Sequence, residues 1–266
     1  NVPWFTDIEK MLAAVKADAA LIGTPSGMHA AHAIACAKAG LHVVCEKPMS
    51  ITLDGADAMI KACDDARVQL FVIKQNRLNT TVQLLRNAID KGRFGRIYFA
   101  VVNVFWARPQ SYYDQAKWRG TWELDGGAFM NQASHYVDLI HWLVGEVDSV
   151  SAVTATLARR IETEDTGSAT IRFRNGAIGS INVTMLVFPK NLEGSVTILG
   201  EKGTVKLGGP ALNKVEAWEF SEYDDDDKAV TQASYALPAG SGAVYGFGHS
   251  AYLKQVVETL DGSRDA

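Results

Sequence analysis

The stretch Leu41-His-Val-Val-Cys-Glu-Lys-Pro48 joins an apolar, β-branched run to two charged residues and a proline. A helical pattern from about Met28 to Lys38 precedes it, closed by Gly40, and the short apolar run 19–22 lies before that helix. Strand, helix and strand in this order predict a βαβ unit of parallel sheet. Lys47 then lies at the carboxyl end of a parallel strand, where open α/β sheets bind their ligands.

The first part of the chain continues this alternation. A helix pattern over 54–66 and a third strand pattern over 69–73 predict half of a doubly wound, Rossmann-type α/β sheet in a first domain, residues 1–76. Such sheets begin with a strand and a G-x-G-x-x-G turn, and none precedes Trp4, so we expect this dinucleotide-binding domain to be incomplete at its N-terminus. The glycine-rich match Gly240-Ser-Gly242 has Tyr245 where the third glycine would stand, and we interpret it as a loop.

After Asn76 the pattern changes to a helix over about 80–91 and then to alternating strands. These predict a second, mostly antiparallel open-sheet domain of α+β class over residues 77–266, with helices on one face. The pair Asn175-Gly176 predicts a hairpin, because both residues tolerate positive φ. A helix from Ala128 to Val144 is expected to cover one face of the sheet, and the other face to join subunits into a homo-oligomer, a dimer or tetramer. The expected strands are 97–106, 149–157, 168–174, 177–186, 195–199, 204–207 and 215–220.

Composition excludes several classes of protein. The 266 residues carry a net charge of −4 with Lys and Arg scattered, which argues against nucleic acid as a partner. The apolar runs are far shorter than the roughly 20 residues that cross a bilayer, and no signal-peptide pattern opens the chain, so we expect no membrane association and a cytoplasmic location. Cys36, Cys45 and Cys63 show no C-x-x-C spacing and are interpreted as buried thiols. The acidic run 224–227 is expected to be a solvated loop.

Several motifs together resemble the glucose-fructose oxidoreductase, inositol dehydrogenase and MocA (Gfo/Idh/MocA) family over nearly the whole chain. The residues that carry this resemblance are Thr24, Pro25, His29, His32, Glu46-Lys47-Pro48, Gly126-Gly127, Asn131, His135 and Asp138. The stretches 106–113, 117–123 and 126–138 further resemble the bacterial UDP-N-acetyl-glucosaminuronate 3-dehydrogenases of O-antigen and lipopolysaccharide synthesis. The resemblance implies NAD-dependent oxidation of the sugar C3 hydroxyl of a UDP-linked N-acetyl-hexosaminuronic acid.

Lys47 and His135 are the expected acid–base pair. Oxidising a secondary alcohol requires a base at the hydroxyl oxygen as hydride moves to the nicotinamide, which suits His135, while a lysine beside it would favour the developing alkoxide. Without this motif context, we would interpret Lys47 as a surface lysine and His135 as a packed helical histidine. Asn131, one turn before His135, stands where many relatives carry an aspartate; an amide orients but adds no charge, so more of the mechanism would depend on Lys47. Asp138 is either a partner of His135 or a helix-surface carboxylate.

The resemblance also assigns binding residues. The cofactor would be NAD, with NADP left open because the residue facing the adenosine 2′ position lies outside this sequence. Its expected contacts are Thr24, Pro25, His29, Glu46, Lys47, Trp118 and Arg119. A nucleotide-sugar substrate brings a diphosphate and a carboxylate, and its expected contacts are Lys47, Asn131, His135, Arg108, Tyr112, Lys117 and Asn191. A zinc site at the histidine pairs was weighed, and no metal is expected, because no acidic or cysteine ligand joins them at typical spacing.

Three functions are compared. The 3-dehydrogenase is the leading one, with another sugar or polyol dehydrogenase of the family as its nearest variant. A glycoside hydrolase that keeps NAD bound and cleaves through transient oxidation is the second. A nucleotide or sugar sensor without catalysis is the third, and the presence of both Lys47 and His135 argues against it.

Overall fold

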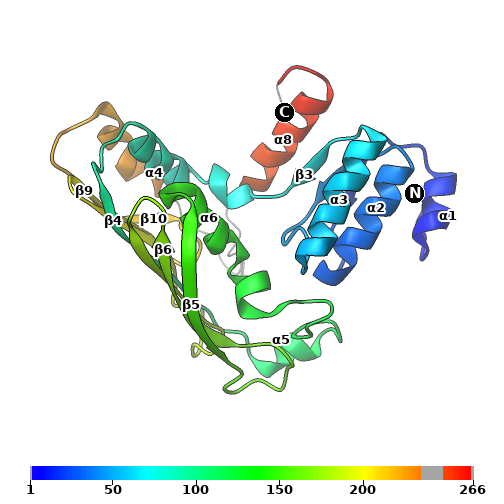
Figure 1. The fold of residues 1–266 in the computed structure, drawn as a ribbon, viewed down its shortest axis with the longest axis horizontal. Helices are drawn as coiled ribbons and strands as arrows, with labels where there is room; N and C mark the ends of the chain where they lie inside the picture. The colour runs from blue at the N-terminus through cyan, green and yellow to red at the C-terminus, as the bar shows by residue number, and fades with distance from the viewer. Residues whose placement is uncertain (1, 235–247, 265–266) are drawn as a thin grey trace.

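The first sheet has three parallel strands in the order β1-β2-β3, formed by β1 (Ala19–Ile22), β2 (His42–Cys45) and β3 (Leu70–Val72). The computed structural model describes residues 2–234 and 248–264. Helices α2 and α3 pack beside each other on this sheet (Figure 1). The helical segments of this part are α1 (Ile8–Ala14), η1 (Ser26–Met28), α2 (His29–Lys38) and α3 (Leu53–Ala66).

Local chemistry accounts for these boundaries. The Thr52 side chain accepts the Gly55 N–H and caps the start of α3, while Gly40, at φ +82°, ends the turn after α2. The three cysteines are free and buried, as predicted, and burial raises the pKa of the Cys45 thiol to about 12. They are therefore packing residues of the α2–sheet–α3 core.

The second sheet has seven strands in the order β10-β9-β8-β4-β7-β6-β5. All neighbours pair antiparallel except β4 and β7, which run parallel. The mostly antiparallel second sheet is thus confirmed, with one parallel pair at its centre. Its strands are β4 (Ile97–Phe105), β5 (Val147–Ala155), β6 (Thr166–Phe173), β7 (Ile178–Thr184), β8 (Glu193–Gly200), β9 (Gly203–Gly208) and β10 (Lys214–Phe220).

Helices cover the inner face of this sheet, where alternate residues such as Ala100, Val102 and Val104 meet Leu139 and Ile140 in one core (Figure 1). The described helical segments of this part are η2 (Gln75–Leu78), α4 (Thr80–Asp90), α5 (Gln110–Asp114), η3 (Ala128–Gln132), α6 (Ser134–Val144), η4 (Asp225–Ala229), α7 (Val230–Ala233) and α8 (Gly248–Leu260). Among the described residues, no helix combines the length and apolarity needed to span a bilayer.

The outer face of the second sheet carries a row of hydrogen-bonded side chains. Ser168 Oγ donates to Asn182 Oδ1 at 2.7 Å, and Asn182 Nδ2 donates to Asn103 Oδ1 at 3.0 Å. Asn103 Nδ2 in turn donates to Glu193 Oε1 at 3.3 Å. This row, which we call the polar ladder, crosses β6, β7, β4 and β8, and the half-buried Val101 lies beside it.

The chain returns to the first sheet near its end. Helix α8 packs against β3 and η2, where Val256 joins Val44 and Ile73 in a small core (Figure 1). The Tyr252 hydroxyl donates to Val72 O at 2.7 Å. Residues late in the sequence therefore pack on the first sheet. The predicted domain boundary after residue 76 remains a prediction.

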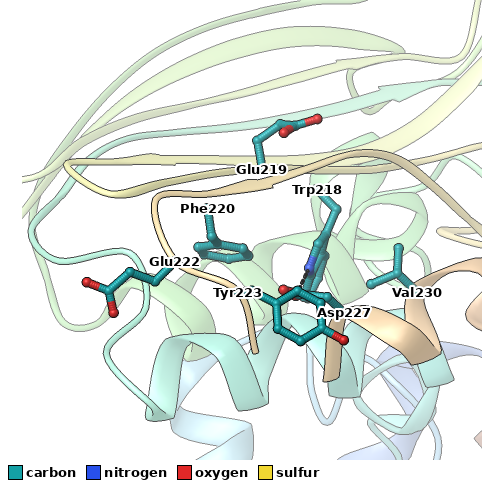
Figure 2. Close-up of a pocket in the computed structure, with 7 residues that line it drawn as sticks. All are labelled: Trp218, Glu219, Phe220, Glu222, Tyr223, Asp227 and Val230. Atoms are coloured by element: carbon teal, nitrogen blue, oxygen red, sulfur yellow. Dashed lines mark hydrogen bonds between the residues drawn. The ribbon is translucent and has the colours of Figure 1, made fainter. Parts of the chain in front are cut away.

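The acidic run 224–227 differs from the predicted solvated loop. It forms η4, with Asp224 as its N-cap in a capping box, and Asp227 accepts from Arg93 at 2.7 Å and 3.0 Å. Asp227 also accepts from Trp218 Nε1 at 2.7 Å, beside the rings of Phe220 and Tyr223 (Figure 2). Lys91 and Arg93, which directly follow α4, pair with this run, so it joins the end of β10 to the segment after α4.

Two further predictions need correction in detail. The helix expected over 128–144 is broken: a π-helical turn, η3, ends at Gln132, Ala133 follows it, and α6 begins at Ser134. The hairpin at Asn175-Gly176 is present, but only Gly176 has positive φ, at +89°, so the turn is not one with two left-handed residues. The match at Gly240-Ser-Gly242 and Tyr245 lies outside the described residues.

Candidate active site

The site lies where the carboxyl ends of β1 and β2 meet a segment of the second domain. The turn after β1 carries Gly27, whose N–H donates to Leu124 O at 3.0 Å. A Cβ built on Gly27 would lie 2.0 Å from Glu123 O, so glycine is required for this close approach of two backbones. The predicted cofactor turn at Thr24 and Pro25 and the segment that follows Trp118 are thereby brought together.

Lys47 crosses from the first domain to the second. Its Nζ donates to Asn131 O at 2.8 Å and to Asn131 Oδ1 at 3.3 Å. The carbonyl also accepts from Ser134 Oγ at 3.2 Å, at the break between η3 and α6. Burial lowers the pKa of Lys47 to about 8, against the opposing pull of the Glu46 and Asp125 carboxylates. The lysine is therefore held in place and close to a change of charge near neutral pH.

His135 lies at the start of α6 and is 4% exposed. Gln75 Nε2 lies 3.0 Å from His135 Nε2, and an amide nitrogen can only donate, so His135 Nε2 is the acceptor. Burial and the positive charge of Lys47 lower the pKa of His135 well below its usual range. The imidazole is therefore neutral and able to accept a proton.

Gly126 and Gly127 shape the turn that leads into η3. Both have positive φ, at +88° and +93°, and a Cβ on Gly127 would lie 2.3 Å from the Glu164 carboxylate. That carboxylate accepts the Phe129 N–H at 2.9 Å, and burial raises its pKa. On the other side of the two glycines, Asp125 is 4% exposed and accepts from Gly120 N at 2.8 Å and from Asn131 Nδ2.

His29 holds the predicted cofactor turn in place. It is 1% exposed, and its Nδ1 lies 2.7 Å from Pro48 O while its Nε2 lies 2.8 Å from Thr24 O. Both partners are carbonyl acceptors, so the ring ties the Thr24 turn to the loop after Lys47. Thr24 is exposed and its Oγ1 pairs with His32 Nδ1 at 3.1 Å. His29 therefore positions the turn rather than facing a ligand.

Glu46, predicted to bind a ribose hydroxyl, lies at the same edge of the sheet. Its Oε2 accepts the Lys47 N–H at 3.1 Å, and its Oε1 lies 3.4 Å from His249 Nε2 on α8. His249 was not singled out from the sequence. Helix α8 thus brings a late-sequence histidine to the cofactor edge.

The predicted substrate residues Arg108, Tyr112 and Asn191 gather together with the predicted cofactor residue Arg119. The Arg119 guanidinium lies 4.1 Å from the Tyr112 ring centroid and 5.0 Å from that of Trp118, and its buried Nε has no hydrogen-bond acceptor. Arg108 donates to Asn191 Oδ1 at 3.3 Å and lies over Tyr112 at 5.3 Å. We call Arg108, Tyr112, Trp118 and Arg119 the arginine–aromatic cluster. It can bind anions, because guanidinium groups match carboxylate and phosphate oxygens.

Two predicted residues lie apart from these contacts. Lys117 is exposed on the surface. Asp138 is not a partner of His135: Arg77 donates to both of its oxygens, at 2.8 Å and 2.7 Å, and Lys74 Nζ lies 3.6 Å away. Asp138 therefore joins α6 to η2.

A cavity of about 780 Å³ lies between α6 and the inner face of β5 and β6. Its lining is mainly apolar, with Val137, Val150 and Ile171 among its residues, and neither Lys47 nor His135 belongs to it. It lacks the arginine–aromatic cluster, so it does not fit a charged nucleotide. Among the described residues, no group of three or more His, Cys, Asp or Glu side chains could hold a metal ion.

The carboxyl edge of the first sheet fits a nicotinamide dinucleotide. A Cβ built on Gly23, directly after β1, would find no heavy atom within 4 Å, so open space lies beside the strand end. Thr24 and Glu46 follow β1 and β2 at this edge, where Glu46 N donates to Ile22 O, and their hydroxyl and carboxylate suit ribose hydroxyls. The ligand-binding edge of an open α/β sheet is therefore present and polar.

Sequence reasoning missed Gln75 and Asp125. Gln75 follows β3, at the same carboxyl edge as Lys47, and that position was the available signal. Asp125 directly precedes Gly126, so a carboxylate before a Gly-Gly turn could have been noticed. Asp165 was also missed: burial alone would raise its pKa, but three backbone N–H groups lower it, and they shape the loop of Arg159, whose Nε donates to Arg108 O at 2.7 Å.

Fold and site together define an oxidoreductase with a nicotinamide-binding sheet. Residues 1–74 match the oxidoreductase family with an NAD-binding Rossmann fold, and residues 82–206 match the GFO/IDH/MocA C-terminal domain. The chain belongs to the Gfo/Idh/MocA family of oxidoreductases. The expected family, fold class and NAD-binding Rossmann domain are confirmed.

Two solved structures are similar along almost the whole chain. The WlbA dehydrogenase of Bordetella pertussis, in complex with NADH and UDP-GlcNAcA, is 59% identical with a TM-score of 0.93, over 98% of this chain and 74% of that one. The WlbA dehydrogenase from Chromobacterium violaceum, with the same two ligands, is 54% identical with a TM-score of 0.92, over 98% and 72%. Levoglucosan dehydrogenase of Pseudarthrobacter phenanthrenivorans is 30% identical over 82% of this chain, which spans 62% of that protein.

Proposed function

We propose that this protein is an NAD-dependent dehydrogenase that oxidises the sugar C3 hydroxyl of a UDP-linked N-acetyl-hexosaminuronic acid. The observation that carries this proposal is the 59% identity to an enzyme solved with NADH and UDP-GlcNAcA. The arginine–aromatic cluster supports it, because a UDP-linked uronic acid carries a diphosphate and a carboxylate that need cationic partners.

The acid–base pair accounts for the proton. NAD, when bound, supplies the hydride acceptor. His135 is neutral and buried, and its one acceptor lone pair lies on Nε2, where Gln75 Nε2 donates to it. A substrate hydroxyl that replaces this amide donor at Nε2 would pass its proton to that lone pair. Lys47, whose pKa is about 8, is mostly protonated at pH 7 and stabilises the developing alkoxide. Asn131 aims the ammonium through two acceptor oxygens.

A second candidate is another sugar or polyol dehydrogenase of the family, favoured by the 30% identity to levoglucosan dehydrogenase. The test uses the full-length protein with NAD and measures NADH absorbance. The substrates are UDP-GlcNAcA, its non-carboxylated parent UDP-GlcNAc, levoglucosan and myo-inositol. NADH formed only with the uronate supports the proposal, and NADH formed only with an uncharged sugar overturns it. Glycan cleavage without net NADH would instead indicate an NAD-dependent glycoside hydrolase.

The substrate class suggests the biological role of the reaction. Nucleotide sugars of this kind are precursors of surface glycans, so we propose a role in O-antigen and lipopolysaccharide sugar synthesis in the cytoplasm. Deleting the gene and examining the lipopolysaccharide sugars by mass spectrometry tests this role. An unchanged sugar composition would contradict it.

We also propose that the outer face of the second sheet joins subunits in a dimer or tetramer. Its polar ladder and the half-buried Val101 lie on a face on which no described helix packs. Val101→Glu should yield monomers in size-exclusion chromatography with light scattering. The control, Leu53→Glu, changes a residue that is 84% exposed on α3 and should keep the oligomer. An unchanged mass for Val101→Glu would contradict this proposal.

A further inference from the structure

Asp125 is connected to Lys47 through one side chain. The Asp125 carboxylate is 4% exposed; one oxygen accepts the Gly120 N–H at 2.8 Å and the other accepts from Asn131 Nδ2. Asn131 then accepts from Lys47 Nζ through its side-chain and backbone oxygens. Carboxylate, amide and ammonium form a continuous chain in a buried setting.

The carboxylate fixes the orientation of the amide. Because Asp125 can only accept when ionised, Asn131 must turn its NH₂ toward Asp125, and its Oδ1 therefore faces Lys47. An asparagine without this partner could rotate by half a turn and present donors to an ammonium that has only donors. An aspartate at 131 would place two carboxylates in contact, and one of them would take up a proton. The pair Asp125 and Asn131 avoids both outcomes.

We propose that Asp125 is a positioning residue of the reaction: acting through Asn131, it holds the Lys47 ammonium in its orientation and adds a buried negative charge to this hydrogen-bonded chain. Asp125 touches no reacting atom. The inference rests on the proposed dehydrogenase function for its kinetic consequence only, since the charge of Lys47 can be measured without substrate.

Other charges around this chain are already engaged. On the Lys47 side, Glu46 accepts the Lys47 backbone N–H and faces His249, so its carboxylate is shared between two partners. Lys74 and Arg108 oppose protonation of Lys47, and His135 is neutral. Burial raises the pKa of Asp125, while the hydrogen bonds from Gly120 N and Asn131 and the charges of Arg119 and Lys47 favour its ionised form. Glu164 lies beyond Gly127 and accepts the Phe129 N–H. Asp125 is thus the buried carboxylate linked by hydrogen bonds to the ammonium.

The direct test is an NMR titration of Lys47 in the full-length protein without substrate, with lysine labelled at ¹³Cε and the signal assigned by Lys47→Arg. Asp125→Asn should lower the pKa of Lys47 by about one unit. The double variant Asp125→Asn/Asn131→Asp moves the carboxylate next to Lys47 and should return the pKa to the wild-type value or above it. Glu164→Gln, a matched loss of a buried carboxylate, should leave the Lys47 titration unchanged.

The kinetic test follows the pH dependence of kcat. In Asp125→Asn, the fall of kcat at high pH should move to lower pH by the same amount as the titration, and the double variant should restore it. If Asp125→Asn does not fold, Asn131→Leu cuts the same connection and should also lower the pKa of Lys47. A wild-type titration in either folded variant overturns the proposal. If wild-type protein oxidises none of the sugars while the titration shifts as expected, only the proposed function fails.

Discussion

The side-chain amide of Gln75 donates to His135 Nε2 across 3.0 Å, and these two residues come from the end of the first sheet and the start of α6. The donor is an amide, so the imidazole keeps its proton on Nδ1 and stays neutral. The tautomer of His135 therefore depends on a residue 60 positions earlier in the chain.

Gln75→Glu should raise the pKa of His135, because a carboxylate beside the imidazole favours its charged form. The base would then be lost at higher pH, and the acidic fall of kcat/KM should move upward by about one pH unit. The pH profile of sugar oxidation checks this. Gln69→Glu, at an exposed position before β3, is the control and should keep the wild-type profile. If wild type, Gln75→Glu and Gln69→Glu all gave the same pH profile, the contact between residue 75 and His135 would be contradicted.

Gly27→Ala should separate the two domains locally, because its Cβ would lie 2.0 Å from Glu123 O. We expect the free energy of unfolding to fall by about 1–3 kcal/mol, as for an overpacked contact, together with weaker NAD binding. Urea unfolding and NAD titration measure the two effects. For stability, the control is Gly23→Ala, which has open space around the added carbon and should unfold like wild type.

Asp138→Asn should lower the free energy of unfolding by about 1–2 kcal/mol, because it leaves the half-buried Arg77 without its carboxylate. The exposed pair of Lys61 and Asp65 gives the comparison, since Asp65→Asn should change the unfolding free energy by less than about 0.5 kcal/mol. Urea unfolding of both variants measures the two losses of unfolding free energy. Equal losses would mean that the Arg77 contact contributes no more than a surface ion pair.

Asp227→Asn should make the fold less sensitive to acid. Hydrogen bonding to Arg93 holds the pKa of Asp227 well below its usual range. A carboxyl with a lowered folded-state pKa stabilises the fold above its unfolded value of 3.8 and loses this contribution as pH falls through the folded value. The variant should therefore be less stable at pH 7, by about 2 kcal/mol, and lose less stability on acidification below about pH 4.

Thermal unfolding between pH 7 and pH 2 measures this slope. Asp225→Asn is the matched control in the same acidic run, because Asp225 is 86% exposed and, among the described residues, forms an ion pair with Lys228 alone. An Asp227→Asn protein with the acid slope of wild type would show that the Arg93 contact does not set the titration.

The regular elements were readable from the sequence because each has its own period. Alternation from Ile97 onward predicts β4, and the helix signals before Gly40 predict α2, both to within one or two residues of their bounds. The parallel pairing of β4 with β7 was not readable, since strand partners depend on contacts between distant segments and not on local period. The return of α8 to the first sheet was hidden for the same reason.

The candidate site was readable only where side-chain chemistry and strand position coincide, as at Lys47. Gln75 and Asp125 gain their roles from partners 60 and 6 residues away, and neither amide nor carboxylate has a sequence signature of its own. The break at Ala133 was equally hidden, because Ala, Ser and Gln are all compatible with a continuous helix.

That break sets a limit on how far the segment can be stabilised. The carbonyl of Asn131 is available to Lys47 where the regular helix is interrupted, and a uniform α-helix from Ala128 onward would engage such a carbonyl within the helix. Substitutions chosen to improve helicity there would raise the melting temperature while depriving the lysine of its acceptor. The irregular turn therefore lowers rigidity at a place that the proposed reaction uses, so engineering for heat resistance should begin at other segments.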